Sequence, residues 1–317
     1  MIRISYSRVQ SYLKCPYQHY LRYYEGLRLK KPIRPLYFGS DFHKLLELRG
    51  RKQELALAKE EISDKYYDMK PQWQAELGDN YVEDLFTIFG DYNRVYKDAI
   101  LPTKTEQPFE VKIGRYRGEP VYFIGIIDEL YELDDKSIKI GEHKTFNRKP
   151  SLSTLTLNTQ KCLYAKAAQY IYGILPHGVI WDYIKSTPAK SPVWLEKSGR
   201  FSTAKSQDVT NYSWLRACKE HGITDKDIIR QGKQYKGNLP NFFFRVEQDF
   251  LPQMVDTVWE SFVYTCKDIT KQGSTNKTRN FTRDCEYCSY YAICHSECTG
   301  GNTKNLIDKD YEVKERS

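Results

Sequence analysis

The chain has 317 residues, of which 28% are charged, and its 49 Lys and Arg exceed its 41 Asp and Glu to give a net charge of +8. No segment approaches the ~20 consecutive apolar residues that a membrane-spanning helix needs. The N-terminal sequence MIRISYSRVQ lacks the apolar stretch of a signal peptide. We therefore expect a cytoplasmic protein with no membrane partner, built as two domains or one elaborated domain.

Positive charge is concentrated in two segments. Residues 1–49 hold ten Lys or Arg against three Asp or Glu, and residues 185–237 hold eleven against five. Together with 26 Tyr, 14 Phe and 5 Trp, this suits a nucleic-acid surface, where cations meet phosphates and rings meet bases. A solvated basic face explains the charge equally well. On the first interpretation, DNA contacts are expected from Arg22, Arg28, Lys30, Lys31 and Arg34.

The first hundred residues are predicted to be mainly helical. Helical spacing predicts a helix over 5–25, in which Pro16 kinks the helix or starts a new turn. A basic, proline-containing loop over 26–38 and a second helix over 39–50 follow. Residues 51–100 are typical of two or three amphipathic helices.

An α/β core is predicted over 101–275. The expected strands are 109–113, 121–133, 137–145, 179–186 and 241–247, and the expected helices are 153–174 and 251–271. Residues 187–240 are rich in Pro, Ser, Gly and Lys, which indicates an insertion around a short helix. A cysteine-rich segment covers 276–301, and the polar tail over 302–317 is expected to be mobile.

Two carboxylates and a lysine lie on the predicted strands. Asp128 follows an apolar strand in GIIDEL, and Glu142 and Lys144 lie two residues apart in GEHKT. Alternate residues of a strand share a face, so Glu142 and Lys144 can converge while His143 points away and offers its backbone carbonyl. Carboxylates and a carbonyl suit Mg²⁺ or Mn²⁺, and a lysine beside them can activate water or offset charge on a phosphate. Alone, such a pair on an exposed strand is usually cross-strand charge pairing.

Two further motifs flank these residues, so that four motifs follow one another along the chain. The motifs are His43 in GSDFHKLLE, Asp128 in GIIDE, Glu142 and Lys144 in GEHKT, and Gln160 with Tyr164 in QKCLY. This order resembles the PD-(D/E)XK nuclease superfamily, specifically its RecB-like branch. The third motif begins with Glu where relatives commonly have Asp, which lies within the pattern of the family. The resemblance implies a restriction-endonuclease-like core, with a mixed central sheet flanked by helices and a helical N-terminal region.

The resemblance also implies a role for each motif residue. His43, Asp128, Glu142 and the backbone carbonyl of His143 would bind Mg²⁺ or Mn²⁺, and Lys144 would support the attacking water. Gln160 and Tyr164 would face the site and position DNA. Glu110, on the strand before Asp128, matches a position that is often acidic in the family.

Eight cysteines in a chain without an export signal are expected to be reduced. Cys162, Cys218 and Cys266 stand apart from one another and are expected to be small buried residues. The other cysteines near the C-terminus crowd into 14 residues, a density that indicates a metal; they are Cys285, Cys288, Cys294 and Cys298.

Cys15, in LKCPYQHY, extends the resemblance to the iron–sulfur branch of the RecB-like nucleases, which includes AddB and the CRISPR adaptation exonucleases. In that branch one N-terminal and three C-terminal cysteines hold a [4Fe–4S] cluster, which here implies Cys15, Cys285, Cys288 and Cys294. The alternative is a Zn²⁺ site made of Cys285, Cys288, Cys294 and Cys298, with Cys15 only a packing residue.

The function expected from these observations is metal-dependent hydrolysis of DNA phosphodiester bonds, by an exonuclease acting on single strands or ends. A non-catalytic DNA-binding or assembly module is the alternative from another class, and the presence of Asp128, Glu142 and Lys144 argues against it. The chain lacks a G-x-x-x-x-G-K-[ST] motif. That absence fits a nuclease subunit that serves a separate helicase, recombination or adaptation protein.

Overall fold

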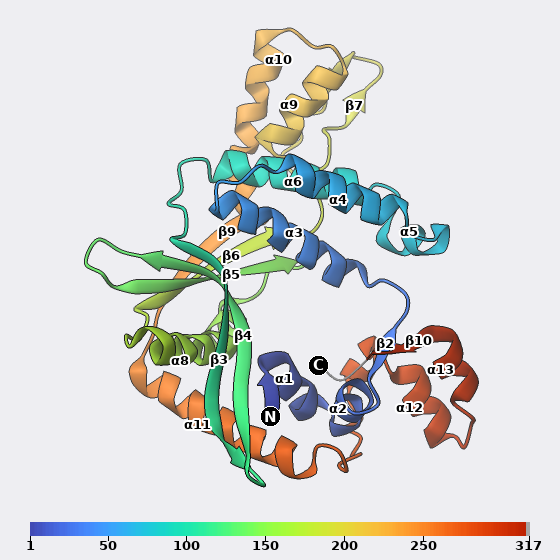
Figure 1. The fold of residues 1–317 in the computed structure, drawn as a ribbon. Helices are drawn as coiled ribbons and strands as arrows, with labels where there is room; N and C mark the ends of the chain where they lie inside the picture. The colour runs from blue at the N-terminus through green and yellow to red at the C-terminus, as the bar shows by residue number, and fades with distance from the viewer. Residues whose placement is uncertain (315–317) are drawn as a thin grey trace.

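A six-stranded mixed sheet forms the centre of the protein in the computed structural model, which describes residues 1–314 apart from the side chain of Leu152 (Figure 1). Its strands run in the order β1-β4-β5-β6-β9, and β3 pairs with the other edge of β4. The bounds are β1 Ile2–Ser5, β3 Lys104–Tyr116, β4 Glu119–Glu132, β5 Ile138–Phe146, β6 Gly178–Lys185 and β9 Phe243–Asp249. β1 is parallel to β4, and β5 is parallel to β6; the other pairs are antiparallel.

Helices cover both faces of this sheet (Figure 1). One face packs against α8 and α11, and its core includes the buried rings of Phe123, Trp181 and Phe262. The other face packs against α3 and α6, with Phe42, Leu45 and other apolar side chains in a second core. The bounds are α3 Arg34–Gly50, α4 Ala56–Tyr67, α5 Pro71–Leu77, α6 Tyr81–Val95, α7 Leu152–Thr156, α8 Gln160–Tyr172 and α11 Pro252–Gln272. The predicted mixed sheet, flanking helices and helical N-terminal region are confirmed.

The helix expected over 5–25 is two helices, α1 (Tyr6–Lys14) and α2 (Pro16–Tyr23). Cys15 between them is extended, at φ −160° and ψ 112°. Pro16 then occupies the first turn of α2, where its missing N–H costs nothing and its fixed φ favours helix. The break sets Cys15 apart from both helices.

The two ends of the chain are joined by a small sheet. β2 (Leu27–Leu29) pairs antiparallel with β10 (Tyr311–Val313), and Gly26 at φ +71° lets the backbone of Lys314 approach closely. α12 (Tyr291–Cys298) and α13 (Lys304–Asp310) precede β10. The expectation of a mobile tail is therefore wrong for 304–313, because the ring of Tyr311 is buried and its hydroxyl donates to the Ser289 carbonyl at 2.6 Å.

The insertion over 187–240 forms a small unit with its own core. It contains β7 (Trp194–Leu195), β8 (Arg200–Phe201), α9 (Asn211–Glu220), α10 (Lys226–Gln231) and the 3₁₀ segment Gly232–Asn241. Trp214 is fully buried at its centre, against Phe201 and Tyr235. Among the described helices, none combines the length and apolarity needed to cross a bilayer.

Candidate metal centre

Asp128 and Glu142 lie next to each other at the point where β4 and β5 separate. The ladder between these strands ends at the pair Glu129 and Gly141, so Asp128 and Glu142 occupy the next positions. The backbone N–H of His143 donates to Asp128 Oδ2 at 2.9 Å, which fixes the carboxylate against β5. The strand pairing thus brings together the two acids that the sequence separates by 14 positions.

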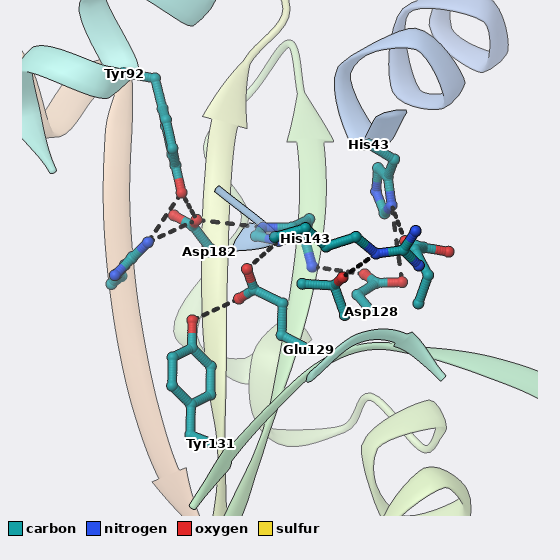
Figure 2. A network of polar contacts seen from close by, with 11 residues as sticks. His43, Tyr92, Asp128, Glu129, Tyr131, His143 and Asp182 are labelled. Carbon is teal, nitrogen blue, oxygen red and sulfur yellow. Dashed lines mark hydrogen bonds and ion pairs between the residues drawn. The ribbon is translucent and has the colours of Figure 1, made fainter. Parts of the chain in front are cut away.

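His43 reaches this place from α3 (Figure 2). Its Nδ1 lies 3.7 Å from Asp128 Oδ1 and 3.9 Å from Glu106 Oε1. One ligand atom from each of these three residues falls within 4.8 Å of the other two, so they can hold one metal ion. An open cavity of about 510 Å³ adjoins His43 and Glu106, which leaves room for a substrate.

Glu106 replaces Glu110 as the third acid near the cluster. Its neighbours Thr105 and Gln107 pair with Glu129 and Ile127 of β4, so Glu106 stands opposite Asp128, with an unusual φ of +46°. Glu110 lies four residues along β3, or roughly 13 Å, and its Oε1 accepts from Arg3 Nε at 2.9 Å. The structure therefore places the predicted additional acid away from the site. The sequence could have predicted Glu106 only if the exact residue pairing between β3 and β4 were known.

The side chain of Glu142 is almost fully buried, at 1% exposure. Burial raises its pKa to about 8, Lys144 opposes this shift and the Asp128 carboxylate adds to it. Its Oε2 accepts from Lys144 Nζ at 3.0 Å, but its Oε1 is buried without a hydrogen-bond partner. A cation beside Asp128 would satisfy that oxygen, so the residues present fit a divalent metal.

Lys144 points to the same side of β5 as Glu142. Burial by itself would lower the pKa of Lys144, but the carboxylates of Glu142 and Asp128 raise it above its usual value. The side chain keeps 30% of its surface exposed. It therefore presents a stable positive charge at the edge of the carboxylate cluster.

Gln160 and Tyr164 approach from the first turns of α8. Tyr164 packs edge-on to Phe109 at a centroid distance of 5.2 Å. Burial raises the pKa of its hydroxyl, Glu142 adds to the shift and a hydrogen bond with Gln160 opposes it. Gly125 of β4 leaves space for both rings, since a Cβ there would lie 2.5 Å from the Phe109 ring and 3.2 Å from the Tyr164 hydroxyl. Tyr164 thus lies near Glu142, and Gln160 is hydrogen-bonded to it.

The ring of His143 points to the opposite face of β5 from the side chains of Glu142 and Lys144, and it packs edge-on to the His43 ring at a centroid distance of 5.6 Å (Figure 2). Its Nε2 is 3.1 Å from Glu129 Oε1, and its Nδ1 is 3.2 Å from Asp182 Oδ2. Burial alone would lower the pKa of His143, but these two carboxylates raise it well above its usual value. Tyr92 and Arg245 also bind Asp182. Buried ion pairs therefore join four adjacent strands behind the site, and sequence analysis did not anticipate them.

A comparison with protein families identifies the superfamily. The family model described as "PD-(D/E)XK nuclease superfamily" matches residues 3–295. The chain belongs to the PD-(D/E)XK nuclease superfamily. Membership implies metal-dependent hydrolysis of phosphodiester bonds, with DNA as the substrate, and the restriction-endonuclease-like core is confirmed.

A solved structure titled "Crystal structure of SSO0001" is similar at 17% sequence identity, covering 92% of this chain and 85% of that chain with a TM-score of 0.36. A search of curated proteins finds no match.

The basic residues expected to contact DNA differ in whether contacts within the protein already engage their side chains. Arg34 donates to the Leu77 carbonyl and pairs with Asp84 at 3.1 Å, which commits it to holding α3 against α6. Lys31 lies 3.5 Å from Glu76, and Lys30 donates to the Asp308 carbonyl. The remaining two, Arg22 and Arg28, have no acidic partner within residues 1–314.

Five cysteines of this nuclease line one cavity of about 250 Å³ near the chain ends; they are Cys15, Cys285, Cys288, Cys294 and Cys298. The first four are partly buried, whereas Cys298 is exposed. Burial raises the pKa of Cys288, and the thiols of Cys15 and Cys285 add to the shift. The cavity therefore brings Cys15 to the C-terminal cysteines across 270 positions.

Proposed function

We propose that the protein is a divalent-metal-dependent deoxyribonuclease that acts as an exonuclease on single strands or ends. One observation carries the hydrolytic part: Asp128, Glu142 and Lys144 converge beside His43, in a chain that belongs to a nuclease superfamily. The preference for single strands or ends rests on the resemblance to the RecB-like branch.

The roles of the residues follow from their chemistry. Asp128, Glu142, His43, Glu106 and the His143 carbonyl are the atoms that would hold Mg²⁺ or Mn²⁺. When bound, the metal supplies a Lewis acid that polarises the phosphoryl oxygen and lowers the pKa of water.

Lys144 orients the attacking water and offsets negative charge on the phosphate as it develops. It can do so because its own charge is held by Glu142 at 3.0 Å while part of its surface stays open. Gln160 and Tyr164 position the strand beside it.

We also propose that Cys15, Cys285, Cys288 and Cys294 hold a [4Fe–4S] cluster that ties the chain ends together. The shared cavity supports this set because Cys15 adjoins it. The surrounding contacts already join the ends: Tyr17 N–H donates to the Thr278 carbonyl at 3.0 Å.

A zinc ion on Cys285, Cys288, Cys294 and Cys298 is the alternative. Tetrahedral zinc with Zn–S bonds of ~2.3 Å brings thiolates to about 3.8 Å from one another. Within residues 1–314, no three Sγ atoms lie within 4.8 Å of one another. A [4Fe–4S] cluster would use Cys15, which lines the same cavity and has no role in the zinc set.

The partner expected for such a nuclease is a separate helicase, or a recombination or adaptation protein. This rests on the resemblance and stays a proposal.

End-labelled single- and double-stranded DNA, incubated with purified protein in Mg²⁺, Mn²⁺ or EDTA, tests the function. Cleavage that requires metal, shortens strands from an end and disappears in Asp128→Ala is the expected result. A ladder of internal cuts would reject the exonuclease proposal, and no metal-dependent cleavage would reject the nuclease proposal. RNA of the same sequence serves as the comparison substrate.

A further inference from the structure

Three arginines converge on the ring of Tyr23, and none of them pairs with a carboxylate in the part of the chain that the structure describes. The guanidinium carbons of Arg8, Arg22 and Arg28 lie 5.2, 5.6 and 5.7 Å from the ring centroid. They come from α1, α2 and β2, which pack together at one end of the molecule (Figure 1). Three separate elements therefore direct positive charge to one place.

The hydrogen bonds of Arg8 and Arg28 within residues 1–314 go to neutral groups. Arg8 donates to the Arg3 carbonyl at 3.0 Å and to His19 Nε2 at 3.4 Å. His19 adds no negative charge, and burial lowers its pKa to about 3, with Arg8 adding to the shift. Arg28 donates to the carbonyls of Arg22 and Leu27. Within residues 1–314, no ion pair involves any of the three arginines.

Arg22 has the least satisfied side chain of the three. Its Nε is buried and has no hydrogen-bond partner in the described residues. All three arginines are half-buried, so water screens their mutual repulsion less than it would on an open surface. The ring of Tyr23 attracts each cation, but it cannot neutralise three. An anion with several oxygens would satisfy both the charge and the unused donors.

The helix that carries Arg8 begins near the metal centre. β1 ends at Ser5, which pairs with Ile124 of β4, four residues or roughly 13 Å before Asp128. α1 begins at the next residue, Tyr6. The Tyr6 hydroxyl lies 3.4 Å from Oγ1 of Thr159, the residue that precedes Gln160. α1, which carries Arg8 in its first turn, therefore begins close to the residues around Asp128 and Gln160.

We propose that Arg8, Arg22 and Arg28 form a phosphate-binding site. This site binds the nucleic-acid strand at a phosphate group distant from the scissile bond. The proposal rests on the proposed nuclease function, which it deepens by assigning a second contact with the same strand. Arginine suits this role because its planar fork donates two parallel hydrogen bonds to one phosphate.

The test uses full-length protein in EDTA, so that cleavage does not interfere, and a fluorescent single-stranded oligonucleotide. Arg22→Gln is expected to weaken binding by about ten- to hundredfold, the range for losing a hydrogen bond between charged groups. It should also lower the magnitude of the log affinity–log salt slope by about 0.7. Arg115→Gln, which removes an equal charge from an exposed position in the β3–β4 hairpin, should change neither.

Inorganic phosphate provides an arm that is independent of DNA. Phosphate should raise the melting temperature of wild type and Arg115→Gln above that in chloride at equal ionic strength, and it should do so less for Arg22→Gln. Arg28→Gln is the second variant if Arg22→Gln fails to fold. Oligonucleotides ending in 5′-phosphate, 3′-phosphate or hydroxyl groups identify the source. Equal affinities indicate a backbone phosphodiester, and a preference that Arg22→Gln abolishes indicates a terminal phosphate.

Binding and salt slopes that are identical in Arg22→Gln, Arg28→Gln and wild type would overturn the phosphate site, whereas metal-dependent cleavage would be untouched. The reverse outcome is separable too. A wild type that never cleaves DNA but shows the phosphate-dependent shift, lost in Arg22→Gln, would reject the nuclease and retain the phosphate site.

Discussion

The peptide of His143 and the carboxylate of Asp128 are hydrogen-bonded across two strands, from N–H to Oδ2 at 2.9 Å. On the other side of β5, the imidazole of His143 lies between Glu129 and Asp182. The same residue thus fixes one acid of the metal centre through its backbone and joins the sheet through its side chain. The residue that carries the predicted carbonyl ligand is therefore held through both its backbone and its side chain.

Glu106 and Glu110 make a matched pair for testing the acid from β3. Glu106→Gln should weaken divalent-metal binding about tenfold or more, because it removes a charged oxygen from the group around Asp128. Glu110→Gln removes an equal charge and should leave metal binding within twofold, since Glu110 pairs with Arg3. Isothermal titration with Mn²⁺ measures both. Equal losses in the two variants would refute the assignment of Glu106.

Lys144 should separate metal binding from chemistry. Lys144→Ala is expected to lower cleavage by about 10²- to 10⁴-fold, a typical contribution of a group that supports proton transfer or developing charge. Mn²⁺ should still bind, because Lys144 donates to Glu142 and coordinates nothing. Single-turnover cleavage and metal titration on the same preparation check this. Undiminished cleavage by Lys144→Ala would overturn the site.

The raised pKa of Glu142 predicts how pH affects the metal-free protein. Its pKa is about 8 in the fold against 4.5 for an ordinary Glu. Between these pH values the folded state holds a proton that the unfolded chain has lost. The contribution of Glu142 to the free energy of unfolding is therefore complete below pH 4.5 and is lost as the pH rises to about 8. Melting temperatures in EDTA should therefore fall less steeply across this window in Glu142→Gln.

Metal binding should release this proton. Near neutral pH, calorimetry in two buffers of different ionisation enthalpy should show about one proton released per bound metal, and fewer in Glu142→Gln. Asp128→Asn serves as the control that lowers affinity while Glu142 remains. Equal proton release by wild type and Glu142→Gln would contradict the assignment of the raised pKa.

The cysteine cavity predicts coloured protein. Anaerobically purified protein with a [4Fe–4S] cluster should be brown, absorb broadly near ~400 nm and contain about four irons per chain. Cys15→Ala should remove the colour and lower the melting temperature, whereas Cys298→Ala should retain the iron. Zinc has no such colour. Colourless protein with one zinc that survives Cys15→Ala would reject the cluster.

The basic loop predicts a modest salt dependence of its own. Lys30→Ala combined with Lys31→Ala should flatten the log affinity–log salt slope for single-stranded DNA, because each phosphate contact releases counterions. Arg34→Ala should instead lower the melting temperature, since Arg34 holds Asp84 and the Leu77 carbonyl. Fluorescence anisotropy and thermal unfolding separate the two effects. An unchanged slope in the double variant would show that the loop is solvated and does not contact DNA.

Local pattern in the sequence predicted β3, β4, β5, β6 and β9 of the central sheet in their order, but not β1, and it predicted most of the candidate site. The apolar alternation before Asp128 and the i, i+2 spacing of Glu142 and Lys144 predict a shared face of adjacent strands, because side chains alternate along a strand. The structure contains both strands and places the two acids side by side. The superfamily assignment from these motifs is likewise confirmed.

Only the tertiary structure decided which acid of β3 lies beside Asp128 and Glu142. Counting back from the hairpin pair Tyr116 and Glu119 places Gln107 opposite Asp128, but a bulge between Lys112 and Gly114 shifts the register by one and puts Glu106 there. A slip of one residue exchanges the two faces of a strand, so local composition could not reveal it.

The pairing of the chain ends was also decided only by the tertiary structure. Residues 304–313 are polar and carry no strong local signal, yet Tyr311 finds a buried site against Tyr290. That burial involves residues about 280 positions away, on β2, through the pairing of Tyr311 with Leu29. Contacts of such sequence separation depend on the whole packed chain, which is why the sequence predicted a mobile tail where the fold contains a helix and a strand.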